Sequence, residues 1–136
     1  MMSARPLVCV VDDDASVREA LPDLLHELGF ASQAFPSAKS FLSSSVLGDT
    51  RCLILDIAMR GMTGPELHRE LVDRHLAIPV IFVTALGDET LRPRLLARGA
   101  VDCLFKPVSE QALIEALEAA LHTNGVPPQS QLNTLG

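Results

Sequence analysis

The amino-acid sequence predicts an α/β domain with a parallel, doubly wound sheet that is covered by helices on both faces. Short apolar runs alternate along the chain with stretches whose apolar residues recur at helical spacing. The run Cys52–Leu55 is continuously apolar, which is typical of a strand buried on both faces. Several runs are followed directly by a polar residue, and the carboxyl ends of parallel strands are where such folds bind their ligands.

The first strand is expected at Leu7–Val11, which is apolar throughout. After Asp14 the apolar residues follow a helical period until Gly29, a residue that often ends helices. Pro22 lies inside this helix, opposite the apolar face, where the missing backbone donor costs about 3 kcal/mol or bends the helix. Because the apolar face continues past the proline, we expect the helix to continue too.

The second and third strands are expected at Ala31–Phe35 and Arg51–Asp56. The second is short and only weakly apolar, whereas the third is a nearly continuous run of leucine and isoleucine. Between them Ser37 can cap a short helix that continues through Leu42 before a run of serines.

The third helix is expected at Glu66–His75, where leucine and valine recur at helical spacing. Gly61, Gly64 and Pro65 precede it, and such residues usually mark a loop. The fourth strand follows at Pro79–Val83, another apolar run.

The fourth helix has the weakest pattern, because Pro93 interrupts its apolar residues. A start near Leu91 places this proline in the first turn, where it is tolerated. Val101–Phe105 is the fifth strand, and Ser109 can cap a final helix with one apolar face. The chain therefore alternates five strands with five helices.

One domain is expected over residues 1–122, and residues 123–136 are expected to form a linker. A chain of 136 residues that is 48% hydrophobic supports a single core. Beyond residue 122 the composition changes to glycine, proline, asparagine and glutamine, which cannot bury an apolar face.

The net charge of −6 has the wrong sign for a domain that binds nucleic acid or an anionic membrane through its whole surface. Cys9, Cys52 and Cys103 lack metal-ligand spacing, and we expect them to be reduced thiols packed as small hydrophobic groups. The four histidines are expected at the surface. No secretory signal or membrane-spanning run is present, so we expect a soluble, cytoplasmic protein without a membrane partner.

Five polar residues follow the strands and should meet at one edge of the sheet: Asp12, Asp13, Asp56, Thr84 and Lys106. Two carboxylates about 4 Å apart repel by about 4 kcal/mol at an effective dielectric constant near 20, so a divalent cation would stabilise the cluster. Oxygen ligands without histidine or cysteine favour Mg²⁺. Carboxylates, a metal, a lysine and a hydroxyl are the components of phosphoryl transfer.

Together these segments resemble the receiver domain of two-component response regulators. The resemblance covers residues 6–122 and implies a flavodoxin-like sheet with the strand order 2-1-3-4-5. It is carried by Val10–Asp14, Asp56–Met59 with Met62 and Gly64, Val83–Ala85, Gly99–Asp102 and Lys106-Pro107.

The resemblance also implies the roles of the reacting residues. Asp56 would accept a phosphoryl group from a phosphohistidine of a sensor histidine kinase. Thr84 would donate a hydrogen bond to one phosphoryl oxygen, and Lys106 would pair with another. The peptide bond between Lys106 and Pro107 would be cis, which would direct the lysine towards the site.

For the metal, the resemblance implies that Asp13 and Asp56 bind Mg²⁺ directly and that Asp12 acts mainly through water. The backbone carbonyl of Ala58 would complete the protein ligands. The neighbouring Asp14 has two open interpretations, as a further member of the acidic group or as the cap of the first helix.

The sequence differs from the family pattern at several positions. Cys103 stands where the family usually has a tyrosine or phenylalanine that moves on activation, and Phe105 lies on the same strand face two residues later. We expect the face formed by the fourth helix, fifth strand and fifth helix to be a partner or homodimer surface, with Phe105 as an anchor. Arg60 stands where the family usually has a proline. The apolar side chains of Ala58 and Leu86 flank the site and cannot orient a hydrolytic water by hydrogen bonding. We therefore expect a long-lived phosphorylated form.

The sequence leaves three classes of function open. A phosphorylation-dependent switch, which is not an enzyme beyond its own phosphorylation and dephosphorylation, fits the site best. A receiver-like interaction module that is not phosphorylated is the alternative, because of Cys103 and Arg60. The third class is a flavodoxin-like carrier or an aspartate-nucleophile phosphatase. The carrier would need a phosphate-binding loop after the first strand, and the phosphatase would need a second Asp at position 58; the sequence has neither.

The segment 131–136 resembles the start of a LuxR-type helix-turn-helix domain. DNA binding and transcriptional control would then belong to an output domain outside this chain.

Overall fold

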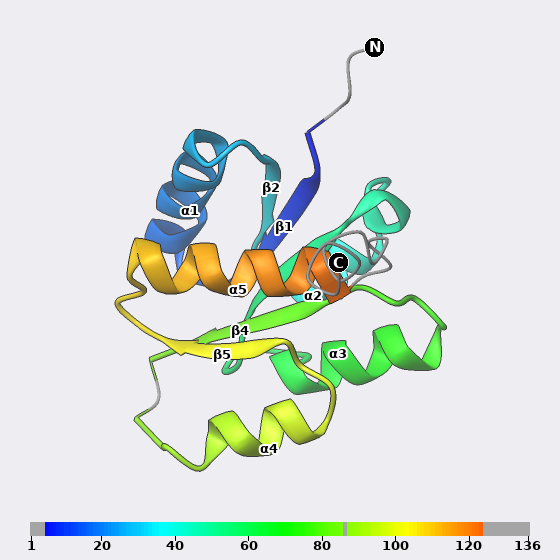
Figure 1. Cartoon of the computed structure of the whole chain (residues 1–136). Coiled ribbons are helices and arrows are strands. Elements are labelled where there is room, and N and C mark those ends of the chain that lie inside the picture. The colour runs from blue at the N-terminus through cyan, green and yellow to red at the C-terminus, as the bar shows by residue number, and fades with distance from the viewer. Residues whose placement is uncertain (1–4, 86, 124–136) are drawn as a thin grey trace, which may run out of the picture.

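The computed structural model describes residues 5–85 and 87–123. Within these ranges five strands alternate with five α-helices and one short 3-10 helix, η1 (Figure 1). The predicted linker, apart from its first residue, and Leu86 lie outside the described residues. In chain order the elements are β1 (Leu7–Val11), α1 (Ala15–Glu27), β2 (Ala31–Phe35), α2 (Ala38–Leu42), η1 (Leu47–Asp49), β3 (Cys52–Asp56), α3 (Gly64–Asp73), β4 (Val80–Thr84), α4 (Leu91–Ala97), β5 (Asp102–Phe105) and α5 (Glu110–Thr123).

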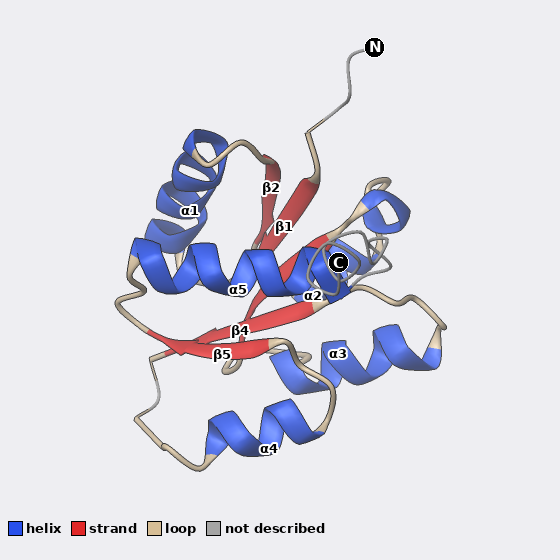
Figure 2. Cartoon of the chain, viewed as in Figure 1, coloured by secondary structure: helices blue, strands red, loops and turns tan. Residues whose placement is uncertain are grey.

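All five strands form one parallel sheet in the order β2-β1-β3-β4-β5, which confirms the predicted fold class and strand order. Helices α1 and α5 lie on one side of the sheet and α3 and α4 on the other (Figure 2). Alternate strand residues therefore face two separate cores. In β1, Val8 and Val10 face α1 and α5, whereas Cys9 and Val11 face α2, α3 and α4.

The strand register brings the predicted site residues to one edge. Val11 is paired with Leu55, so the residues that follow β1 lie beside the end of β3. Thr84, the last residue of β4, is paired with Phe105, directly before Lys106. The chain order reverses between β1 and β3, and ligands of such sheets bind at this reversal.

The third helix begins earlier than the sequence pattern predicted. It starts at Gly64, because the Thr63 side chain accepts a hydrogen bond from the Glu66 N–H while the Glu66 side chain accepts one from the Thr63 N–H. Pro65 lies in the first turn, where its missing donor has no cost. Of the three predicted loop residues, Gly64 and Pro65 begin the helix, whereas Gly61 lies in the loop before it. His75 lies beyond the end of the helix with φ of 61°.

Most other expectations for the fold are confirmed. The first helix continues through Pro22, Ser37 and Ser109 cap α2 and α5, and α4 begins at Leu91. All three cysteines are free and buried. The expectation for the histidines is wrong at His68, which is half-buried against Phe82. Among the described residues, every helix is too short or too polar to cross a membrane.

Candidate functional site

Three carboxylates gather where β1 and β3 end. Asp12 and Asp13 follow β1, and Asp56 is the last residue of β3. One oxygen of each lies within 4.8 Å of one oxygen of each of the others. Asp12 and Asp56 are buried, with 2% and 7% of their surface exposed, whereas Asp13 is exposed. The predicted acidic cluster therefore exists, with two carboxylates withdrawn from water and one facing it.

Lys106 crosses from the end of β5 to this cluster. Its Nζ donates to Asp12 Oδ2 at 3.1 Å and lies 3.9 Å from Asp56 Oδ1. Because the Asp12 side chain is only 3% exposed, this ion pair is shielded from solvent on the carboxylate side. One ammonium thus partly neutralises two buried carboxylates, while the Arg18 guanidinium donates to the backbone carbonyl of Asp12 at 3.0 Å.

Backbone donors fix the orientation of the buried carboxylates. The Ile57 N–H donates to Asp56 Oδ1 at 2.9 Å, and the Asp14 N–H donates to Asp12 Oδ1 at 2.9 Å. Asp14 itself accepts hydrogen bonds from the N–H and hydroxyl of Ser16 and caps α1, which decides between its two interpretations. Each buried carboxylate therefore keeps one oxygen in a backbone hydrogen bond and offers the other to the site.

Burial and charge make Asp56 unusually basic. Desolvation and, after it, the neighbouring Asp12 carboxylate together raise the pKa of its carboxyl to about 6. Lys106 and the hydrogen bond from Ile57 act in the opposite direction. A cation bound nearby, or conversion of the carboxylate to an ester, would therefore lower the free energy of this buried group more than that of an exposed carboxylate.

Thr84 ends β4 beside the cluster and is 1% exposed. Its carbonyl oxygen accepts a hydrogen bond from the Lys106 N–H at 2.8 Å, so the threonine and the lysine are held together by the backbone. The Lys106–Pro107 peptide bond is cis, as the resemblance implied, and Pro107 is exposed.

Gly64, expected only as a loop residue and as part of the family resemblance, also shapes the site. A Cβ at this position would collide with the backbone carbonyl oxygen of Asp56, and its N–H donates to the Ile57 carbonyl at 2.9 Å. The first turn of α3 therefore packs directly onto the backbone of the phosphoryl-acceptor candidate, and only glycine allows that approach. The signal in the sequence was the Thr-Gly-Pro-Glu order of a capping box, which was interpreted as a loop.

The residues that depart from the family pattern are separated by the fold. Cys103 is 1% exposed and packs in the core that faces α3 and α4, whereas Phe105, at the end of the same strand, is 38% exposed. Arg60 and Ala58 are exposed in the loop after β3. Phe105 is thus available at the surface, and Cys103 is part of the core.

The donor set fits a hard divalent cation. The three clustered groups are carboxylates, and in the described part of the chain no histidine or cysteine belongs to the cluster. A cluster with only oxygen ligands, one of them exposed to water, suits Mg²⁺, which keeps several of its own waters. Desolvation is the largest cause of the raised pKa of Asp56 and repulsion from Asp12 is the second, so a cation bound at the cluster would lower that pKa.

Comparison with known proteins gives one consistent result. The family described as "Response regulator receiver domain" matches residues 8–118. Nodulation protein W of Bradyrhizobium diazoefficiens is 39% identical over 118 residues, which are 87% of this chain and 52% of that protein. The transcriptional regulatory protein FixJ of Azorhizobium caulinodans is 40% identical over 114 residues, 84% of this chain and 54% of its own length. The chain therefore spans about half the length of these curated relatives.

Solved structures agree in fold and in sequence. The response regulator StyR superposes with a TM-score of 0.81 at 41% identity, covering 96% of this chain and 66% of that one. The structure described as FixJ-N superposes with a TM-score of 0.76 at 36% identity, covering 90% and 96% of the two chains.

Proposed function

Because this chain belongs to the response regulator receiver domain family, whose members act in phosphorylation-dependent signalling, we propose that Asp56 accepts a phosphoryl group from a sensor histidine kinase. The single observation that carries this proposal is the arrangement around Asp56. A buried carboxylate with a pKa raised to about 6 lies against a second buried carboxylate and 3.9 Å from a lysine ammonium.

In the proposed transfer an oxygen of Asp56 attacks the phosphorus atom of the donor. A P–O bond forms, the P–N bond of the phosphohistidine breaks, and its electron pair leaves with the imidazole, which takes a proton from water. The Ile57 N–H holds Asp56 Oδ1, so the orientation of the carboxylate is set before the donor arrives. The domain turns over no separate substrate, so it acts as a switch and not as an enzyme.

Asp12, Asp13 and Asp56 would hold Mg²⁺, with the Ala58 carbonyl as the remaining protein ligand proposed. When bound, the ion neutralises charge on the transferring phosphoryl group. Asp13 is suited to direct ligation because it is exposed, and Asp12 is suited to a contact through water because its Oδ2 is already paired with Lys106.

Phosphorylation would replace a carboxylate of charge −1 by a group of about −2 with three strong acceptor oxygens. Lys106 lies 3.9 Å from Asp56 and is the cation best placed to move from Asp12 towards the new charge. The Thr84 hydroxyl, at the end of the adjacent strand, would donate to a second oxygen. Both responses would pull on the ends of β4 and β5, which are joined by the hydrogen bond from the Lys106 N–H to the Thr84 carbonyl.

The output of the switch is proposed to be a homodimer through the α4-β5-α5 face, with transcriptional control exerted by a DNA-binding output domain that lies outside this chain. The length of the relatives supports such a domain, since this chain covers about half of each. FixJ is named a transcriptional regulatory protein, and the cytoplasm is the matching location for this function.

Phe105→Ala should weaken phosphorylation-dependent association, because Phe105 is a large side chain on this face that is 38% exposed. We expect a loss of about 1–2 kcal/mol, or roughly a tenfold higher dissociation constant, in sedimentation of the phosphorylated domain. Val72→Ala, which removes the other exposed large hydrophobic side chain of the described residues, is the control. Equal association of both variants and the unmodified domain would exclude Phe105 as an anchor.

A receiver-like module that is not phosphorylated is the second candidate, and it is favoured by one observation. Position 103 holds a cysteine, which has no aromatic ring that could move on activation. The cysteine is also fully packed in the core. Such a module would keep the fold and the acidic cluster while failing to react with a phosphoryl donor.

Intact-protein mass separates the two candidates. We expect the domain to gain one phosphoryl group in Mg²⁺ and acetyl phosphate and to gain none after chelation or as Asp56→Asn. Asp49→Asn, which alters an exposed carboxylate outside the cluster, should be labelled like the unchanged domain. An intact fold without a mass increase would favour the interaction module.

Mg²⁺ should stabilise the domain, and Asp13→Asn should remove most of that effect. An ion at ten times its dissociation constant stabilises the folded state by about 1.4 kcal/mol. Asp13 is exposed and makes no hydrogen bond that fixes the described fold, so the variant should keep its stability in chelator. Thermal unfolding with and without Mg²⁺ measures both quantities. A full Mg²⁺ response in Asp13→Asn would place the ion elsewhere.

A further inference from the structure

A groove separates α3 from α4 on the side of the sheet opposite α1 and α5. It has a volume of about 400 Å³. A second hollow of about 290 Å³ continues it towards the start of β4 and shares His68, Val72 and Arg98 with it. The surface therefore extends along the whole of α3, and it contains none of the residues proposed for phosphoryl transfer. The groove is lined by Pro65, His68, Arg69, Val72, Leu95 and Arg98.

Helix α3 has two apolar faces, of which only one is covered. Leu67 and Leu71 are buried in the core under the sheet. His68 and Val72, one position further along, share the neighbouring face at the i, i+4 spacing and line the groove. Val72 is 58% exposed, the more exposed of the two large hydrophobic side chains that reach the surface in the described residues. A single exposed valine is ordinary, but this one lies in a concave surface with Leu95.

The floor of the groove is firm and uncharged. The His68 ring packs edge-on against Phe82 of β4, with 5.8 Å between the ring centroids and 65° between their planes. Burial lowers the pKa of His68, which favours its neutral form. The floor therefore offers an aromatic and apolar contact surface supported by the central sheet.

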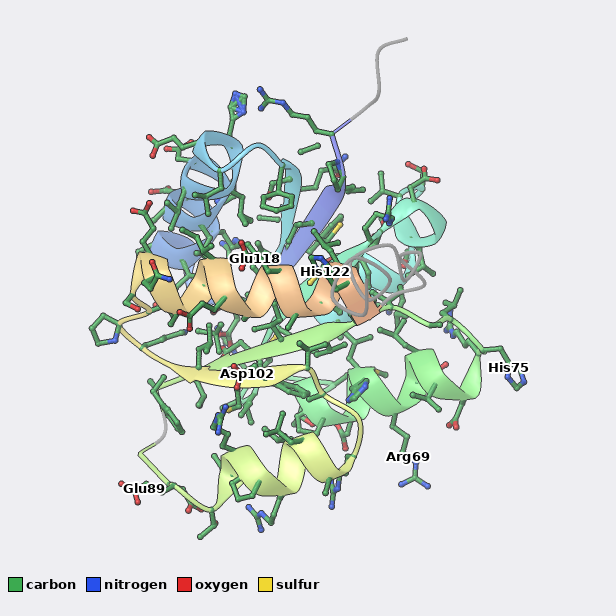
Figure 3. The ribbon with its side chains drawn as sticks, viewed as in Figure 1. Arg69, His75, Glu89, Asp102, Glu118 and His122 are labelled. Atoms are coloured by element: carbon green, nitrogen blue, oxygen red, sulfur yellow. The ribbon has the colours of Figure 1, made fainter. Side chains whose placement is uncertain are left out.

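The charges at the edges of the groove are both positive. Arg69 extends from α3 away from the sheet, as Figure 3 shows, and Arg98 ends α4. In the part of the chain that the structure describes, neither guanidinium lies in an ion pair, whereas Arg74 and Arg92 are paired with Glu70 and Asp102. Neither hollow is lined by a carboxylate. In a chain with a net charge of −6, this is a local site for a negatively charged partner.

We propose that this groove binds an acidic, amphipathic helix of a partner protein. Apolar side chains of that helix would fill the hollow over His68 and Val72, and its carboxylates would pair with Arg69 and Arg98. The ten residues of α3 extend over about 15 Å, so about three turns of a partner helix fit beside it. Two unpaired arginines on the two sides of an apolar floor match such a helix better than they match a fully apolar one.

The probe is a synthetic helical peptide of about 15 residues with leucines on one face and glutamates on the other. Its binding to the ¹⁵N-labelled domain is followed by chemical-shift changes of the backbone amides. A matched peptide carries lysine in place of every glutamate. We expect saturable shifts centred on α3 and α4 with the acidic peptide below about 1 mM and none with the basic one. Shifts at another surface, equal shifts with both peptides, or no shifts with either would refute the proposal.

Charge reversal identifies the arginines. Arg69→Glu with Arg98→Glu should weaken binding of the acidic peptide at least about tenfold and favour the basic peptide. Arg51→Glu reverses an exposed charge outside the groove and should change neither affinity. The double variant should still gain a phosphoryl group from acetyl phosphate, which checks its fold. Unchanged affinity in the double variant would overturn the proposal. Binding of the domain to phosphatidylserine vesicles through the same arginines, with no binding of the acidic peptide, would also overturn it.

Discussion

Gly64→Ala is expected to destabilise the domain by about 3 kcal/mol and to slow its phosphorylation. The new methyl group would meet the carbonyl oxygen of Asp56 well inside contact distance, and both neighbouring groups are backbone, which cannot rotate away. Either α3 or the end of β3 must move, so the hydrogen bond from the Gly64 N–H to the Ile57 carbonyl is also strained. Out of a total stability of about 5–15 kcal/mol this is a large loss.

Gly48→Ala is the matched control for this prediction. A Cβ on Gly48 has no atom within 4 Å, and its backbone does not need a positive φ. The same change of side chain should therefore alter the free energy of unfolding by less than about 1 kcal/mol, with stabilisation as the expected sign. Urea unfolding of both variants, compared at equal m-values, measures the difference. If the two variants were equally stable, α3 would not pack on the backbone of Asp56 as described.

Hydrophobic periodicity predicted the existence and order of all five strands and all five helices, because each element buries at least one face. The start of α3 was not predicted, since Gly64 and Pro65 form loops in most sequences and the reciprocal hydrogen bonds of Thr63 and Glu66 decided otherwise. These bonds depend on side-chain conformations that the period of apolar residues does not contain. The burial of His68 was missed for a related reason, because α3 contacts the sheet with one face and approaches α4 with the next.

The membership of the site was predictable because parallel strands deliver their last residues to one edge. Asp12, Asp56 and Thr84 required only the alternation of strand and helix, and Lys106 followed from the fifth strand. The pairing within the site was not predictable in this way. That Lys106 lies 3.1 Å from Asp12 and 3.9 Å from Asp56 depends on strand register and rotamers. Burial beside Asp12, which raises the pKa of Asp56, depends on the same packing.

Asp56→Asn is expected to make the metal-free domain more stable at pH 8 and to bring no gain near pH 4. The folded protein raises the pKa of Asp56 from 3.8 to about 6, so between these values the folded state holds a proton that the unfolded state releases. The stability contributed by this group is present below pH 4, falls as the pH rises to 6, and is fully lost above it. A shift of this size corresponds to about 3 kcal/mol at most, and screening by the solvent that reaches the cluster reduces the expected gain to about 1–2 kcal/mol.

Asp23→Asn is the control for this titration, since Asp23 is exposed on α1 away from the cluster and should change stability by less than about 0.5 kcal/mol at either pH. The comparison is made by urea unfolding in chelator at pH 4, 6 and 8, and then again in Mg²⁺. Added Mg²⁺ should stabilise the unchanged domain more than Asp56→Asn, because the ion compensates the same carboxylates whose repulsion the amide removes. A variant that is less stable than the unchanged domain at pH 8 in chelator would mean that Asp56 is already compensated within the fold. In that case neither the raised pKa nor the need for a cation would explain why the carboxylate reacts.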